Sequence, residues 1–315
     1  MKKNVLLLIL FLAITTFTAF QVLDEEGYLH DGMPYPIPAN NLLRGGSDPK
    51  TVETKSDDRE HSVLGDGCYH IFIDAGSNRG VHGRFLFEPE KYPKSKFATK
   101  FDEIYGNNRT KKEICVFAFE PNPMHNTSQM AIQEAYQKMG WRYHYMPYGV
   151  SDHNGALTFY RILDRAEKQH EEWGFSMTRN EIVNSSEPIL VDVIDLALWT
   201  ERHIFNRTIP PPNEYHGGAN PVVAMKMDVE GSEYRTIDHM LEMHTACKFD
   251  YIIGELHFKS VVPQTFGRHN LTEVRDVMKY ARYMKGELAK EGCPSFQVLD
   301  DEEYLHDGMP YPTHF

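Results

Sequence analysis

Short apolar runs and stretches with helical spacing alternate along the chain from residue 69 to residue 290. The apolar runs, which predict strands, cover residues 70–74, 114–120, 143–150, 156–161, 222–230 and 251–258, and residues 189–199 are predicted to run from a strand into a helix. Apolar residues three and four positions apart predict amphipathic helices over 124–140, 232–244 and 271–290. Strands that alternate with helices imply right-handed crossovers. We therefore expect an α/β fold with a mostly parallel sheet.

Residues 1–20 differ from this pattern, because a basic start precedes an apolar run. Lys2 and Lys3 stand before the unbroken apolar residues 5–14. This order is typical of a secretory signal peptide, or of a single N-terminal membrane anchor whose lysines stay in the cytosol. A cut after Ala19 would leave bulky Phe17 where signal peptidase prefers a small residue. We therefore favour a retained anchor, and either way we expect the chain to enter the secretory pathway.

The same segment occurs near both ends of the chain. Residues 20–36 read FQVLDEEGYLHDGMPYP and residues 296–312 read FQVLDDEEYLHDGMPYP, so fifteen of seventeen positions are identical. Residues 21–66 lack an apolar period, which predicts a low-order stem before a domain over 67–315. We expect the C-terminal copy to form an edge strand and tail. For the N-terminal copy, we rank a duplication without a role above an arm that exchanges between chains or a stem that docks locally.

Composition narrows the partners and the compartment. Hydrophobic residues make up 41% of the chain, which suits a packed core, and the net charge of −12 comes without a long run of Lys or Arg. Such a chain repels polyanions, so we expect no nucleic-acid partner. The N-x-[ST] acceptor pattern for N-glycans favours a lumenal domain, and it occurs at Asn108, Asn126, Asn184, Asn206 and Asn270.

The four cysteines lack the C-x-x-C pairs of common zinc sites. Cys68 and Cys293 stand at the two ends of the predicted domain, so an oxidising lumen would allow them to form a bridge. Cys115 lies inside an apolar strand pattern, which predicts a buried free thiol.

Polar residues gather directly after the predicted strands, where open α/β sheets bind ligands. The first strand leads into DAGSNRG, residues 74–80, whose glycines allow a tight turn and a close backbone approach to a ligand. Glu120 ends the second strand, and a carboxylate there can accept both hydroxyls of a ribose. Asp152 follows another strand and either meets an adenine amine or makes an Asx turn. Asp228 interrupts an apolar strand, which is unusual for a merely structural residue.

Taken in order, IDAGSNRG, FAFEPNP, GVSDHNG and KMDVEGSE resemble the FkbM family of S-adenosylmethionine-dependent methyltransferases, over residues 69–258. The resemblance implies a doubly wound, mostly parallel, seven-stranded sheet of the Rossmann-like class I type, with S-adenosylmethionine as cofactor. It places the cofactor against Asp74, Gly76, Asn78, Gly80, Glu120, Asn122, Ser151, Asp152 and Asp228. It also places Asp228 and Glu230 where methyl donor and acceptor meet. An insertion over 84–112 and Arg79 inside the glycine loop depart from the pattern.

Methyl transfer to an alcohol also needs a base. The transfer from a sulfonium is an in-line displacement that depends on alignment, and the acceptor hydroxyl must lose a proton. His257 is our first candidate base, with Glu255 two residues away on the same strand face to fix its tautomer. The alternative for His257 is a strand-end residue that caps a loop. No group of acids and histidines has metal-ligand spacing, so we predict no metal.

The sequence therefore predicts an O-methyltransferase of the secretory pathway acting on a hydroxyl acceptor, with a sugar or glycan hydroxyl as the first candidate. The main alternative is a catalytically inactive, methyltransferase-like binding module that is secreted or tethered to a membrane. A dehydrogenase is disfavoured because the glycine loop is not G-x-G-x-x-G. Residues 164–188, which contain Trp173-Gly-Phe-Ser176, are long enough to cover the site as a lid.

Overall fold

The computed structural model describes residues 63–162, 175–176, 186–212, 220–258 and 263–301. All of them belong to one of the two compact units into which the chain divides, residues 58–315. The predicted leader or anchor, nearly all of the stem, and the end of the C-terminal repeat lie outside the described residues. Among the described helices, none is both long and apolar enough to cross a membrane.

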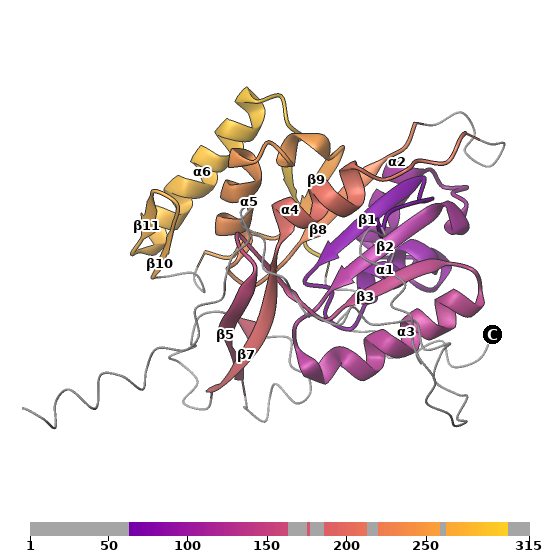
Figure 1. Cartoon of the computed structure of the whole chain (residues 1–315), viewed down its shortest axis with the longest axis horizontal. Coiled ribbons are helices and arrows are strands. Elements are labelled where there is room, and N and C mark those ends of the chain that lie inside the picture. The colour runs from indigo at the N-terminus through magenta and orange to yellow at the C-terminus, as the bar shows by residue number, and fades with distance from the viewer. Residues whose placement is uncertain (1–62, 163–174, 177–185, 213–219, 259–262, 302–315) are drawn as a thin grey trace, which may run out of the picture. The chain divides into compact units, whose positions relative to one another are not determined.

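A six-stranded sheet forms the centre of this unit, and every neighbouring pair of its strands is parallel (Figure 1). In spatial order the strands are β3 (Arg142–Met146), β2 (Ile114–Phe119), β1 (His70–Ala75), β8 (Val223–Met227), β9 (Tyr251–Gly254) and β12 (Phe296–Val298). The chain starts at β1, moves outward to β3, and then returns to the other side of β1 with β8. The strand order thus reverses between β1 and β8, and open α/β sheets bind ligands at such a point.

Helices cover both faces of the sheet, as the doubly wound prediction requires (Figure 1). One face carries α1 (Val81–Phe87), α2 (Lys96–Tyr105) and α3 (Asn126–Lys138), and the other carries α4 (Leu196–Thr200), α5 (Glu233–Glu242) and α6 (Val274–Lys290). The reason that both faces are covered is visible in strand β1, all six residues of which are buried. Phe72 packs into the cluster of the first face, whereas Ile71 and Ile73 pack into that of the second. The helices predicted over 124–140, 232–244 and 271–290 are confirmed as α3, α5 and α6.

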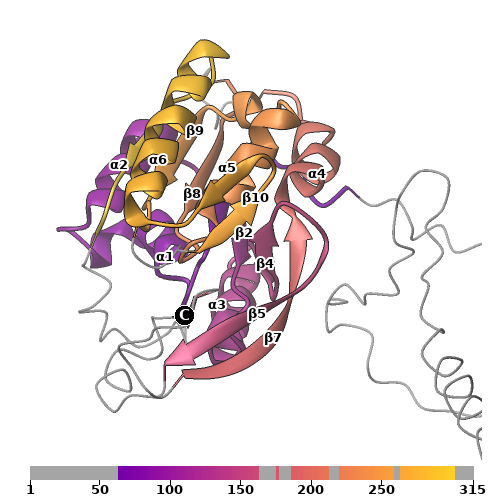
Figure 2. The same ribbon diagram turned by 90° about the vertical axis from the view of Figure 1, so that its left-hand side faces the viewer.

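Among the described residues the central sheet has six strands and not the predicted seven, because some of the predicted strands form a second sheet. This sheet has the order β4-β7-β5-β6 and consists of β4 (Gly149–Ser151), β5 (Gly155–Ile162), β6 (Phe175–Ser176) and β7 (Ser186–Asp195). Figure 2 shows β5 and β7 as a curved pair apart from the central strands. In β5, Ala156 and Thr158 are exposed and Phe159 is buried. A strand with one solvated face suits an antiparallel sheet and not one covered on both sides.

The remaining elements are short. Strands β10 (Gln264–Phe266) and β11 (His269–Leu271) form an antiparallel hairpin. Single helical turns occur at η3 (Pro89–Lys91), η4 (Lys111–Glu113), η5 (Pro123–His125) and η9 (Ala246–Lys248), and η7 (Glu201–Phe205) is a π-helix. β12 lies at the edge of the central sheet and belongs to the C-terminal copy of the repeat.

Two disulfides join the cysteines, Cys68 to Cys115 and Cys247 to Cys293. The expected bridge between Cys68 and Cys293 and the expected free thiol at Cys115 are therefore wrong. Cys68 stands two residues before β1 and Cys115 lies on β2, its parallel neighbour. The pairing of these strands brings the two Cα atoms to 5.8 Å, which is an ordinary distance for a disulfide.

Candidate active site

A cleft opens at the carboxyl ends of β1, β2 and β8, at the point where the strand order reverses. Its empty space, including the part open to solvent, is about 860 Å³. Six of the predicted site residues line it: Gly76, Asn78, Glu120, Asp228, Glu230 and Glu255. They come from four strand ends that are distant in the sequence, so the parallel sheet itself assembles the site.

The glycine loop packs directly against the end of β8. Gly76 has a φ of 75°, and a Cβ atom on it would lie 1.8 Å from the backbone oxygen of Asp228. Asp228 in turn donates its backbone N–H to the oxygen of Ala75 at 3.0 Å. Only glycine fits such a contact with a positive φ. Gly80 also has a positive φ, but it serves as the N-cap of α1 and does not line the cleft.

Glu120 presents a firmly held carboxylate to the cleft. The backbone N–H groups of Asn78 and Asn122 donate to its two oxygens at 2.7 and 2.8 Å. Burial raises the pKa of Glu120 to about 7, although both amide hydrogen bonds act to lower it. Each carboxylate oxygen retains a lone pair for a further donor. Glu120 is therefore placed to accept hydroxyl groups from a ligand, and Asn122 supports it through its backbone.

A buried lysine ties the loop to β8. The Nζ of Lys226 donates to the oxygen of Gly76 at 2.7 Å and lies 3.1 Å from Asp228 and 3.7 Å from Asp74. Asp74 is fully buried, neither of its oxygens has a hydrogen-bond partner among the described residues, and burial raises its pKa to about 7. Our sequence analysis did not assign Lys226 to the site, although a lysine inside the apolar run VVAMKM is a usable signal.

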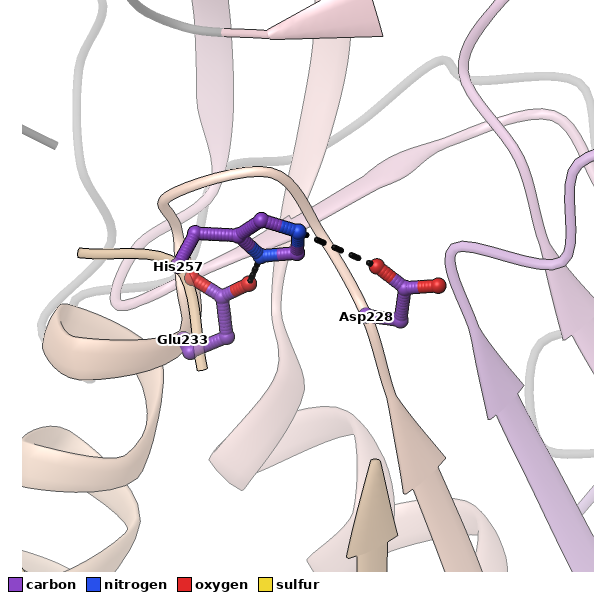
Figure 3. Close-up of side chains that lie close together, drawn as sticks. All are labelled: Asp228, Glu233 and His257. Atoms are coloured by element: carbon purple, nitrogen blue, oxygen red, sulfur yellow. Dashed lines mark hydrogen bonds and ion pairs between the residues drawn. The ribbon is translucent and has the colours of Figure 1, made fainter. Parts of the chain in front are cut away.

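His257 lies within a ring of four carboxylates. Its Nδ1 is 2.5 Å from Glu233, and its Nε2 is 3.6–3.8 Å from Glu230, Asp228 and Glu255. Figure 3 shows the imidazole between the carboxylates of Glu233 and Asp228. Burial acts to lower the pKa of His257, but Glu233 and the other carboxylates outweigh it and raise this pKa to about 10. The imidazole therefore keeps its proton at neutral pH.

The partner that holds His257 is Glu233, and not Glu255 as the strand spacing implied. Glu233 is fully buried, and its two oxygens also accept the backbone N–H groups of Val229 at 3.3 Å and Gly231 at 2.9 Å. An acid in the first turn of a helix usually serves only the helix dipole. The sequence gives no signal that separates Glu233 from that ordinary role, because its partner lies on another strand end.

Glu230 and Glu255 have the properties of proton acceptors. Both line the cleft, whereas His257 does not. Burial raises the pKa of each carboxyl to about 7, which is close to the value that a general base needs at neutral pH. Glu230 also has a φ of 50°, a strained backbone conformation for a residue other than glycine.

Five of the nine predicted cofactor residues do not line the cleft: Asp74, Gly80, Asn122, Ser151 and Asp152. The hydroxyl of Ser151 donates to Asp152 at 3.0 Å, and Asp152 forms ion pairs with His153 at 2.7 Å and Arg235 at 3.7 Å. Their neighbours Gly149 and Val150 line the cleft instead. Arg79, which departs from the family pattern, is not among the lining residues.

The second sheet supplies an aromatic wall. Phe159 on β5 and Phe175 on β6 stack with ring centres 5.2 Å apart, and both line the cleft with Tyr148. Phe175 belongs to the predicted lid, most of which lies outside the described residues. Sequence analysis missed Phe159, because its alternating strand reads equally well as ordinary packing.

The same region contains donor atoms of the kind that bind metal ions. Asp228, Glu233 and His257 each offer one such atom, and the three atoms lie within 4.8 Å of one another. These residues are not spaced like metal ligands in the sequence, although they lie close together in the fold. The absence of ligand spacing is therefore no argument against a metal site here. The absence of a catalytic metal stays a prediction. The ring also contains a positive charge of its own, the imidazolium of His257.

Comparison with known proteins gives one family. A model of the methyltransferase FkbM domain matches residues 74–284, which is more than half of the chain. The match begins at Asp74, ends in α6, and contains every residue that lines the cleft. Searches of curated proteins and of solved structures gave no match.

Proposed function

Because the chain belongs to the FkbM methyltransferase family, we propose that it transfers a methyl group from S-adenosylmethionine to a hydroxyl acceptor. The observation that carries this proposal is the cleft where the strand order reverses, with a close-packed glycine loop on one side and the carboxylate of Glu120 on the other. This arrangement supports binding of a nucleoside through its ribose hydroxyls.

The described residues fit such a cofactor. Glu120 would accept the ribose hydroxyls, and the backbone of Gly76 and Asn78 would border the amino-acid end. The two oxygens of Asp74 are buried beneath the glycine loop and have no hydrogen-bond partner among the described residues, which fits an ordered water next to the cofactor site. When bound, S-adenosylmethionine supplies an electrophilic methyl group.

The acceptor proton passes to a carboxylate in this proposal. Glu230 and Glu255 face the cleft with pKa values of about 7, so a fraction of each is ionised and able to take a proton at neutral pH. His257 keeps its proton and balances the negative charge of these groups. This assignment replaces His257 as the first candidate base and makes it a positioning residue.

A neutral acceptor such as a sugar or glycan hydroxyl suits the cleft. Four carboxyl groups, Glu120, Asp228, Glu230 and Glu255, face it, three of them only partly ionised near pH 7, against the single ammonium of Lys226 among its described lining residues. This charge disfavours phosphorylated or otherwise anionic acceptors. Next to these groups, the wall of Tyr148, Phe159 and Phe175 offers apolar surface to the less polar side of a sugar ring.

We place the activity in the secretory pathway, within the lumen of the endoplasmic reticulum or Golgi or outside the cell. Two disulfides support this, since such bonds persist in oxidising compartments. The basic and apolar residues 1–20 support entry, with or without retention as a single membrane anchor. Protease protection of the full chain in isolated microsomes tests the placement, because a cytosolic chain is digested without detergent.

Calorimetry tests the cofactor and separates the main alternatives. We expect heat of binding with S-adenosylmethionine and with its demethylated product, and none with NAD. An absence of binding to the first two compounds would contradict the methyltransferase proposal. The alternative of an inactive binding module predicts no methyl transfer, so a labelled-methyl screen over glycans, lipids and small alcohols distinguishes it from the enzyme and identifies the acceptor.

A further inference from the structure

Three asparagines of the glycan-acceptor pattern are exposed in this fold. Asn108 lies in the turn between α2 and η4, Asn206 directly follows η7, and Asn270 lies on β11 of the hairpin. The Oδ1 of Asn270 accepts the hydroxyl of Thr265 at 3.0 Å, and this bond does not use Nδ2, the atom that carries an N-glycan. A glycan on any of the three would therefore extend into solvent without displacing packed side chains.

Asn126 is different, although it has the same sequence pattern. It is the first residue of α3 and is only partly exposed. The hydroxyl of Tyr145 lies 2.5 Å from its Oδ1 and 3.2 Å from the backbone oxygen of Glu120, so these two acceptors share the single proton of the phenol. Asn126 is less exposed than the other three and lies against the buried Tyr145 next to the candidate site, so a sugar on its Nδ2 has less room. Asn184, the fifth asparagine of the pattern, lies outside the described residues.

Two of the three exposed sites lie away from the cleft. Asn108 stands shortly before β2, and all central strands are parallel, so it lies toward the amino ends of the strands. Asn206 lies toward the same edge, because the neighbouring Thr208 and Arg207 bind the backbone of Gly67 and Cys68, just before β1. The cleft opens at the opposite, carboxyl edge. Asn270 is nearer to that edge but is not among the lining residues.

We infer that Asn108, Asn206 and Asn270 carry N-linked oligosaccharides in the mature protein and that Asn126 does not. The inference rests on the lumenal placement proposed above. In the reaction, Nδ2 forms a bond to C1 of an oligosaccharide carried by a lipid diphosphate. The bond from C1 to the diphosphate oxygen breaks, the lipid diphosphate leaves, and one N–H proton is released. The co-reactant is thus a lipid-linked oligosaccharide of the host secretory pathway.

Site mapping on the full chain from secretory cells tests the inference. Peptides are treated with peptide N-glycosidase in water labelled with oxygen-18, which converts each glycosylated Asn into labelled Asp. We expect label at Asn108, Asn206 and Asn270 and none at Asn126. Asn108→Gln should lower the mass by one glycan, whereas Asn107→Gln, a change at an exposed neighbour outside the pattern, should leave the glycan in place.

A second sample separates this inference from the placement of the chain. It is the full chain with a known cleavable leader fused in front, recovered from the lumen. If only this fusion is labelled at the three sites, the proposed compartment is wrong and the site assignment holds. If the lumenal fusion has no label at the three sites, or is labelled at Asn126, the assignment is overturned.

Discussion

At the residue scale, burial and not hydrogen bonding sets the chemistry of the candidate site. Asp74, Glu120, Glu230 and Glu255 all have pKa values raised to about 7, and desolvation is the largest cause for each. Groups that change charge near neutral pH are common where enzymes bind and move protons. The same groups make the fold sensitive to pH.

Glu120 should make the stability of the fold fall as pH rises. Its pKa is about 7 in the folded state and 4.5 in the unfolded chain, so the folded state binds its proton more tightly. The contribution of this proton to the free energy of unfolding is fully present below pH 4.5 and is lost as the pH rises through 7. It amounts to about 3 kcal/mol. Urea unfolding at several pH values should show a smaller loss in Glu120→Gln than in the native chain. If the unfolding free energies of the two proteins changed equally with pH, the raised pKa of Glu120 would be contradicted.

His257 should remain protonated through neutral pH because of Glu233. We expect its imidazole signals in NMR to stay unchanged between pH 6 and 8 in the native chain. In Glu233→Gln the midpoint of the His257 titration should fall by at least about one pH unit, since a neutral amide no longer favours the charged ring. Glu134→Gln is the control, a surface carboxylate paired with Lys138. A native midpoint near 6.5 would restore His257 as a candidate base.

Of the predicted strand-end acids, Glu120, Asp228, Glu230 and Glu255 line the cleft, whereas Asp74 and Asp152 do not, and the partner of His257 was missed. Asp228 stands out because it interrupts an apolar strand, and its position in the cleft follows from the parallel sheet. Glu233 does not stand out, because an acid at the start of a helix is common. Its contact with His257 joins the start of α5 to the end of β9, and no local pattern encodes that contact.

At the element scale, the loop after β1 depends on the absence of a side chain at Gly76. Gly76→Ala should destabilise the protein by at least about 2 kcal/mol more than Gly292→Ala, because overpacking adds to backbone strain. The two glycines have similar φ values, 75° and 72°, but nothing lies within 4 Å of a Cβ built on Gly292. Equal losses of unfolding free energy in urea titrations would mean that the contact with Asp228 relaxes.

The segment after β12 fixes the start of α2. The carboxylate of Asp301 accepts the hydroxyl of Ser95 at 2.6 Å and the backbone N–H of Phe97 at 3.0 Å. Asp301→Ala should therefore cost about 1–3 kcal/mol of unfolding free energy, because it leaves two buried donors unpaired. Asp300→Ala, at the exposed neighbour, should cost much less. Thermal or urea unfolding of both variants checks this, and similar losses would remove the capping role of Asp301.

Elements of the central sheet were predictable because their residues are buried on both sides and read as continuous apolar runs. Strands β1, β2 and β8 are of this kind. The strand over 156–161 and the passage from strand to helix over 189–199 were also predicted, but the sheet to which these strands belong was not. The sheet that a strand joins depends on which neighbouring strand has a matching edge. The alternation of Phe159 with exposed residues predicts that one face of the strand is buried, but it does not predict the neighbouring strand.

At the scale of the whole described unit, two disulfides link elements that are distant in the sequence. One links the segment before β1 to β2, and the other links η9 to the loop after α6. Replacing Cys68 and Cys115 together with Ser should cost roughly 2 to 4 kcal/mol of unfolding free energy. A nonreduced digest analysed by mass spectrometry should yield the peptide pairs Cys68–Cys115 and Cys247–Cys293. A linked peptide that contains Cys68 and Cys293 would contradict this connectivity.

The cleft is assembled from two pieces of the fold whose hydrophobic cores are only partly separate, because Val150 of the second sheet belongs to the core of the central sheet. The central sheet supplies the glycine loop and the carboxylates, whereas Phe159 and Phe175 belong to a small cluster of their own with Val191 and Val193. Substitutions within this small cluster can therefore accumulate without disturbing the packing beneath the glycine loop. Related chains can thus diverge in the acceptor that they methylate while the part of the cleft that binds the methyl donor stays the same. Exchanging residues 155–195 between such chains is therefore a direct way to change acceptor selectivity.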